Sequence, residues 1–101
     1  MNKIDIVVYE DIERDIGRAA LLRFNKLCET LEAQNIFIKR YSFTKDEEQC
    51  KENQDLWHLI FCAGADMLPA TYVNGRIEKI EAYPTKKDIC TWLPDARFTE
   101  R

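Results

Sequence analysis

The sequence lacks any long hydrophobic run and contains few residues that interrupt secondary structure. No apolar stretch approaches the roughly 18 residues that a membrane-spanning helix needs, and the first residues lack the basic flank and apolar stretch of a signal peptide. We therefore expect a cytoplasmic protein that does not associate with membranes. The 101 residues include only three glycines and three prolines. This length predicts a single domain over residues 1–93, followed by a polar C-terminal tail over residues 94–101.

Paired cysteines are also absent. None of the four cysteines lies within three residues of another; they are Cys28, Cys50, Cys62 and Cys90. This spacing excludes a Cys-x-x-Cys redox motif, a zinc-ribbon pair and a dense disulfide framework, so a dithiol oxidoreductase is not expected. Cys28 falls on the apolar stripe of a predicted helix, where a buried thiol behaves as a small hydrophobic group. We expect Cys90, beside Ile89, to be structural as well.

The charge balance does not favour nucleic acid. Fifteen basic and eighteen acidic side chains give a formal net charge of −3, so DNA binding would need a local basic patch. The candidates are the pairs 39–40 and 86–87, with Arg14, Arg18 and Arg23 along the first predicted helix. No helix-turn-helix or other reader motif accompanies them. Two-residue basic clusters are ordinary solvated surface in most domains, so operator DNA is only an alternative partner.

Hydrophobic patterning predicts the first half of the fold. Residues 4–9 are mostly β-branched and predict a central strand, and residues 36–41 predict a second strand. Between them, residues 17–34 repeat apolar side chains at three- and four-residue steps, which is typical of a helix. Residues 44–53 are polar and predict a solvated loop or the start of a helix. The strand, helix and strand form a βαβ unit, which implies parallel strands.

The second half predicts a helix, a hairpin and a final helix. A short apolar stripe over residues 56–63 ends at Gly64, which fits a helix C-terminus. Strands over residues 70–73 and 76–80 are joined by Asn74 and Gly75, the dipeptide that a type I′ turn prefers. Thr85 and Asp88 resemble a capping box. Together the elements predict an α/β domain with a mixed four-stranded sheet, a βαβ unit followed by αββα, and helices on its faces.

The order of these elements is that of the thioredoxin fold, and several local sequences resemble the ArsD family. They are residues 34–41, residues 64–69, residues 73–75, residues 83–85 and residues 92–93. The resemblance covers roughly residues 36–93 well. It implies a thioredoxin-like fold, a homodimer, and kinship with arsenical-resistance-operon trans-acting repressors and arsenite metallochaperones. Those chaperones hand the metalloid to an ArsA-type ATPase, which makes such an ATPase the partner that the resemblance implies.

The sequence departs from this family in the loop that follows the first strand. The family carries a vicinal cysteine pair and a third cysteine there, because trivalent arsenic is a soft centre that prefers three thiolates. Here the loop, residues 10–17, contains no cysteine. His58 and Cys62 lie four residues apart and could offer two metal ligands, but the local sequence supplies no third. We expect a surface histidine and a packed cysteine at a helix end, and we predict no cofactor.

The same loop is the candidate recognition surface. It carries Glu10, Asp11, Glu13, Arg14 and Asp15. Carboxylates near a helix start favour its N-terminus and remain solvated, and no nucleophile, histidine or phosphate-binding glycine motif lies beside them, so we do not expect an enzyme.

A second segment completes this predicted recognition face. The resemblance implies that Pro69 follows a cis bond and faces the loop, so Leu68 and Pro69 belong to the same surface. The leading hypothesis is a non-catalytic regulatory or protein-docking module. The alternative is an arsenite- or antimonite-binding metallochaperone, or an arsenic-responsive transcriptional repressor, that uses the other cysteines.

Overall fold

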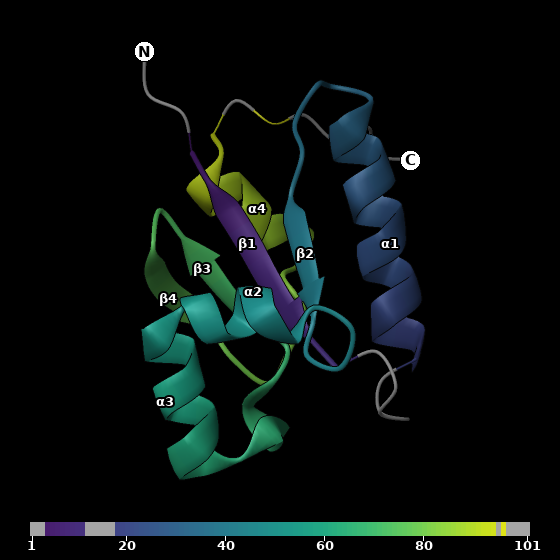
Figure 1. The fold of residues 1–101 in the computed structure, drawn as a ribbon. Coiled ribbons are helices and arrows are strands. Elements are labelled where there is room, and N and C mark those ends of the chain that lie inside the picture. Colours follow the sequence, from purple (N-terminus) through teal and green to yellow (C-terminus); the bar gives the residue numbers. More distant parts are fainter. Residues whose placement is uncertain (1–3, 12–17, 95, 97–101) are drawn as a thin grey trace.

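The computed structural model describes residues 4–11, 18–94 and 96, and these form one sheet with helices against it (Figure 1). The elements are β1 (Ile6–Glu10), α1 (Arg18–Glu32), β2 (Lys39–Ser42), α2 (Glu47–Glu52), α3 (Gln54–Ala63), the short 3-10 helix η1 (Ala65–Met67), β3 (Ala70–Val73), β4 (Arg76–Lys79) and α4 (Lys86–Trp92). None of these helices is long and apolar enough to cross a membrane.

The four strands form one mixed sheet in the order β2-β1-β3-β4. β1 pairs in parallel with β2 and antiparallel with β3, and β3 and β4 form an antiparallel hairpin. This confirms the predicted α/β class, the βαβ unit and the hairpin. β1 is a central strand with a hydrophobic core on each face of the sheet, which explains why its sequence is apolar on both faces. Tyr9 pairs with Ala70, so the end of β1 lies beside the start of β3.

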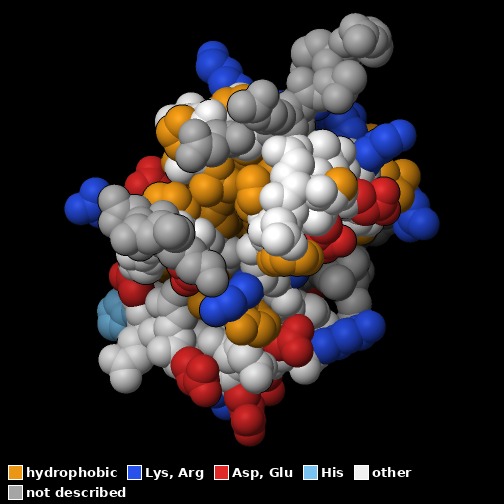
Figure 2. Space-filling view, turned by 90° about the horizontal axis from the view of Figure 1, so that it is seen from above, with side chains coloured by type: hydrophobic (Ala, Val, Ile, Leu, Met, Phe, Trp, Pro, Cys, Tyr) orange, Lys and Arg blue, Asp and Glu red, His pale blue; other side chains and the backbone are white. Residues whose placement is uncertain are grey.

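The helices cover both faces of the sheet and give it two separate cores. α1 and α4 pack on one face; its buried residues are Ile6, Val8, Phe24, Leu27, Cys28, Leu31 and Ile89. The second core lies on the face of α2 and α3; it consists of Tyr9, Cys50, Leu56, Met67, Leu68, Ala70 and Tyr72. In Figure 1, α2 lies in front of the sheet and α4 behind it. On the face seen from above, a group of hydrophobic side chains is visible, and the charged side chains lie mostly nearer the outline (Figure 2).

Element bounds differ from the predictions where tertiary contacts decide them. The second strand begins at Lys39 rather than at residue 36, because Ile36 and Ile38 pack against the first core before the strand pairing begins. Residues 47–52 form α2 with Cys50 fully buried. A new helix then starts because Asn53 caps α3, accepting a hydrogen bond from the Leu56 amide at 3.0 Å.

The hairpin turn and the last helix agree with their local signals. Asn74 and Gly75 both have positive φ, 53° and 82°, as a type I′ turn requires. Thr85 and Asp88 form a reciprocal capping box at the start of α4. Beyond α4, the partly buried Ala96 packs against the first core. That part of the predicted tail therefore contacts the domain, whereas residues 95 and 97–101 lie outside the described residues.

Candidate functional site

The C-terminal end of β1 and the Leu68-Pro69 bond, which precedes β3, lie at the same end of the sheet. The pairing of Tyr9 with Ala70 places Pro69 next to the residues that follow Tyr9. The Leu68-Pro69 bond is cis, as the resemblance implied. Leu68 is buried in the second core, and Pro69 is partly exposed. The described start of the predicted loop, Glu10 and Asp11, therefore lies near Pro69, while residues 12–17 lie outside the described residues.

The predicted recognition face is only partly described. Asp11 is partly exposed directly after β1. Glu13, Arg14 and Asp15 lie outside the described residues. Asp11 and Pro69 are thus the partly exposed members of this face within the described ranges.

The expectation that Glu10 belongs to a solvated loop was wrong. Glu10 is the last residue of β1 and is 1% exposed. Its carboxylate accepts hydrogen bonds from Arg40 Nε at 2.6 Å and from Arg40 Nη2 at 2.8 Å, and a third from the Tyr83 hydroxyl at 2.6 Å. Burial of this carboxylate is tolerated because a bidentate guanidinium compensates its charge and all three donors satisfy its oxygens. Glu10 therefore cannot contact a partner protein directly.

Aromatic rings extend this network towards the surface. Phe24 stacks on Tyr83 with ring centroids 4.9 Å apart, and the Arg40 guanidinium lies 4.8 Å from the Phe24 centroid. Burial and the hydrogen bond to Glu10 raise the pKa of Tyr83 above its usual value, so the phenol remains a proton donor. Arg40 Nη1 also donates to Asn25 Oδ1 at 2.7 Å. These contacts fix the orientation of the Tyr83 ring.

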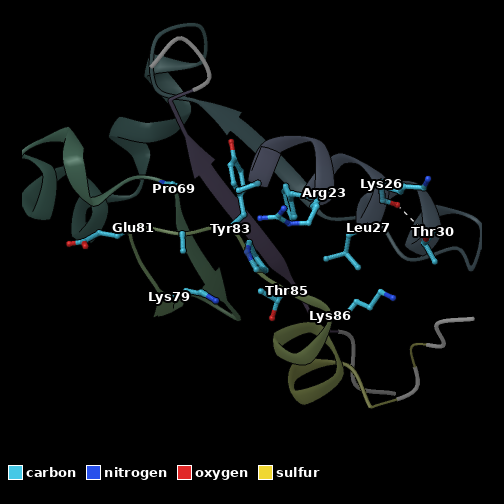
Figure 3. A pocket seen from close by; sticks show the side chains of 14 residues that line it. Arg23, Lys26, Leu27, Thr30, Pro69, Lys79, Glu81, Tyr83, Thr85 and Lys86 are labelled. Atoms are coloured by element: carbon cyan, nitrogen blue, oxygen red, sulfur yellow. Dashed lines mark hydrogen bonds between the residues drawn. The ribbon is translucent and has the colours of Figure 1, made fainter. Parts of the chain in front are cut away.

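A groove of about 830 Å³ lies above these rings, between α1 and the segment that joins β4 to α4 (Figure 3). Its lining consists of Ala20, Arg23, Phe24, Lys26, Leu27, Thr30, Pro69, Lys79, Glu81, Ala82, Tyr83, Pro84, Thr85 and Lys86. Pro69 belongs to this lining, so the groove adjoins the predicted recognition face. The groove is not predictable from the sequence, because no local pattern links α1 to residues 79–86.

The structure brings some of the basic candidates together and separates others. Arg23 and Lys86 lie on opposite sides of the groove (Figure 3). Arg40 is engaged with Glu10, and Lys39 lies 3.8 Å from Asp5 in an exposed pair on β2. Arg14 lies outside the described residues.

The cysteines do not converge. Cys28 is buried in the first core and Cys50 in the second, so the sheet separates them. Burial raises the pKa of both thiols to about 11. Cys62 and Cys90 are exposed, which corrects the expectation of a packed helix end for Cys62 and of a structural role for Cys90. Cys62 is exposed because it lies on the outer side of α3, away from Leu56, which is the buried residue of this helix.

His58 is exposed, as expected. Within residues 4–11, 18–94 and 96, no group of three or more His, Cys, Asp or Glu side chains is placed to hold a metal ion. The third ligand that His58 and Cys62 would need is therefore not supplied by the described residues.

Comparison with known proteins places these features in a family context. The family model described as arsenical resistance operon protein ArsD matches residues 15–100. Among solved structures, the chain is similar to the arsenical resistance operon trans-acting repressor from Bacteroides vulgatus ATCC 8482. The TM-score is 0.80 at 23% sequence identity, over 91% of this chain and 93% of that chain. This likeness shows a shared fold. The comparison with curated proteins finds no match.

Proposed function

Because the chain belongs to the ArsD family, we propose that it is an arsenical-resistance regulator that docks onto proteins and does not itself bind arsenite. In this proposal the fold is thioredoxin-like, the protein is a cytoplasmic homodimer, and it catalyses no reaction. The observation that carries the proposal is the position of the cysteines. The loop over residues 10–17 has none. The end of β1, where this loop begins, lies near the cis Leu68-Pro69 bond.

A three-thiolate site within one chain has no support in the placement of the four cysteines. The family's arsenite site gathers three thiolates around one soft arsenic centre. Cys28 and Cys50 lie in cores on opposite faces of the sheet. Their pKa of about 11 keeps them protonated near neutral pH, whereas the thiolate is the metal-binding form. The two exposed thiols, Cys62 on α3 and Cys90 on α4, also belong to helices on opposite faces.

Arsenic retention tests this part of the proposal. Reduced protein is incubated with arsenite, desalted and analysed for bound arsenic by mass spectrometry. We expect far less than one arsenic atom per chain, with no change in Cys62→Ser or Cys90→Ser. Stoichiometric arsenic that is lost in either variant would instead support the alternative, an arsenite-binding chaperone or repressor that uses other cysteines.

Docking is tested separately with an ArsA-type ATPase, the partner proposed from the family. The partly exposed Asp11 lies at the recognition face, so Asp11→Lys should weaken binding measured by titration calorimetry. Glu29→Lys is the matched control, because Glu29 is an exposed carboxylate of α1 that is not among the groove residues. Equal binding by both variants and the unmodified chain would contradict docking through this face.

A further inference from the structure

The groove between α1 and residues 79–86 has the features of a peptide-binding site. We propose that it binds an extended acidic segment of a partner protein, with a hydrophobic side chain of that segment seated on its apolar floor. Pro69 lies at this groove and at the recognition face, so the two surfaces adjoin. The inference rests on the proposed docking function, since it names the chemistry that a docked partner would present.

Charge complementarity favours an acidic occupant. Four cationic side chains line the groove, against a single carboxylate from Glu81; they are Arg23, Lys26, Lys79 and Lys86. The whole chain has a net charge of −3, so the groove reverses the overall sign locally. Lys79 is already paired with Asp88. Arg23 and Lys26 are exposed on α1 and take part in no ion pair formed among the described residues. A carboxylate of a partner can therefore approach them without breaking an existing pair.

The floor of the groove is apolar and held in place. The stacked rings of Phe24 and Tyr83 lie under the groove, and the partly exposed Tyr83 ring offers the apolar contact, together with the lining residues Ala20 and Ala82. Phe24, Leu27 and Pro84 are buried and support this floor from below. The Tyr83 ring cannot swing away without losing its hydrogen bond to the buried Glu10. A preformed apolar surface lowers the conformational entropy cost of binding, because its side chains need not be ordered when the partner docks. It therefore suits an aliphatic or aromatic side chain between two acidic residues.

The dimensions favour an extended chain over a compact small molecule. The α1 wall runs from Ala20 to Thr30, which at the helical rise corresponds to about 15 Å. An extended peptide covers this distance with about five residues. The cations are distributed along both walls and do not converge on one point (Figure 3). This arrangement matches several carboxylates along a chain better than one small anion.

Fluorescence anisotropy with labelled six-residue peptides tests the proposal. The first probe alternates glutamate and leucine, the second lysine and leucine, and the third glutamate and serine. We expect the glutamate–leucine peptide to bind most tightly and to weaken as salt is added, because the contacts include charges. The glutamate–serine peptide should bind more weakly, because it offers nothing to the apolar floor.

Charge reversal locates the binding. The double variant Arg23→Glu with Lys26→Glu should weaken the glutamate–leucine peptide by about tenfold or more, on the scale of two lost charge-assisted contacts. The matched control reverses Lys45 and Arg76, two exposed cations that do not line the groove, through Lys45→Glu and Arg76→Glu. Both variants change the net charge equally. An equal loss in both would show unspecific attraction and overturn the proposal.

A steric variant distinguishes the proposed peptide from other occupants of the groove. Ala20→Phe places a larger side chain at the groove and should also abolish peptide binding, with the fold checked by circular dichroism. If sedimentation instead shows a dimer of the unmodified chain that Ala20→Phe dissociates, the groove is a self-association surface and the proposal fails. If glutarate competes as strongly as unlabelled peptide does, the groove is a small-anion site and the proposal likewise fails. Failure of peptide binding alone leaves the Asp11 titration and the arsenic measurement standing as tests of the proposed function.

Discussion

Glu10 and Arg40 form a two-pronged ion pair across adjacent parallel strands, with Nε–Oε2 and Nη2–Oε1 distances of 2.6 and 2.8 Å. Arg40 is aligned with Val8, two residues before Glu10, so both side chains lie on the α1 face of the sheet. Tyr83 joins the pair from the segment before α4. One buried carboxylate thus connects β1, β2 and the floor of the groove.

Removal of the guanidinium should destabilise the fold strongly. In Arg40→Met the Glu10 carboxylate stays buried with only the Tyr83 hydroxyl as partner. Leaving a buried charge uncompensated costs about 3–5 kcal/mol, and we expect the lower end because Arg40 is 27% exposed. Urea unfolding followed by tryptophan fluorescence measures the loss. Lys39→Met, which removes an exposed pair with Asp5, should change the free energy of unfolding by less than about 1 kcal/mol. Similar losses in both variants would contradict a role for the buried pair.

The capping box should contribute measurably to the stability of α4. The Thr85 hydroxyl accepts from the Asp88 amide at 3.3 Å, and the Asp88 carboxylate accepts from the Thr85 amide at 2.9 Å. Thr85→Ala should therefore cost about 1 kcal/mol in urea unfolding. Thr91→Ala is the control, because Thr91 is exposed in the same helix and donates only to the Lys87 carbonyl. Its effect should be near zero, since alanine is the better helix former.

Asp88 should also make stability depend on pH in the acid range. Burial alone would raise its pKa, but hydrogen bonds from Lys79 and Thr85 outweigh burial and hold the pKa below the usual 3.8. A carboxyl with a lowered folded-state pKa stabilises the fold above its unfolded pKa, and this contribution is lost as pH falls through the folded value. The stability difference between the unmodified chain and Asp88→Asn should be constant above about pH 5, shrink as pH falls below 3.8, and disappear once pH is below the lowered folded-state pKa. A difference that persists at low pH would contradict the electrostatic origin.

Thiol reactivity should divide the cysteines into two pairs. With a pKa of about 11, only roughly one in a thousand Cys28 or Cys50 thiols is ionised at pH 8. Both are also buried, whereas Cys62 and Cys90 are exposed. Iodoacetamide should therefore modify two sites rapidly in the native protein and four after denaturation, as intact mass spectrometry would report. Rapid native labelling of Cys28 would show that the α1 core opens readily.

The sequence predicts those parts of the molecule that local chemistry determines. The Asn74-Gly75 turn and the box of Thr85 and Asp88 depend on residues at most three positions apart, and both agree with the structure. The burial of Glu10 depends instead on partners 30 and 73 residues away, which no local pattern reveals. The groove was missed for the same reason. From the sequence alone, a carboxylate at a strand end is predicted to be solvated, because its cationic partner, here Arg40, is far away in the chain.

Direct operator binding gives a last discriminating measurement. A sequence-independent attraction to DNA requires several cations free to contact phosphates. Arg40 is committed to Glu10, and Lys39 lies beside Asp5. Arg23 and Lys86 line the groove. Because the cations lie on its two separate walls, the groove suits a peptide chain better than a DNA duplex. We therefore expect no salt-sensitive gel shift with operator DNA at low ionic strength. A shift that the Arg23→Glu and Lys26→Glu double variant abolishes would assign these cations to DNA and favour the repressor alternative over docking.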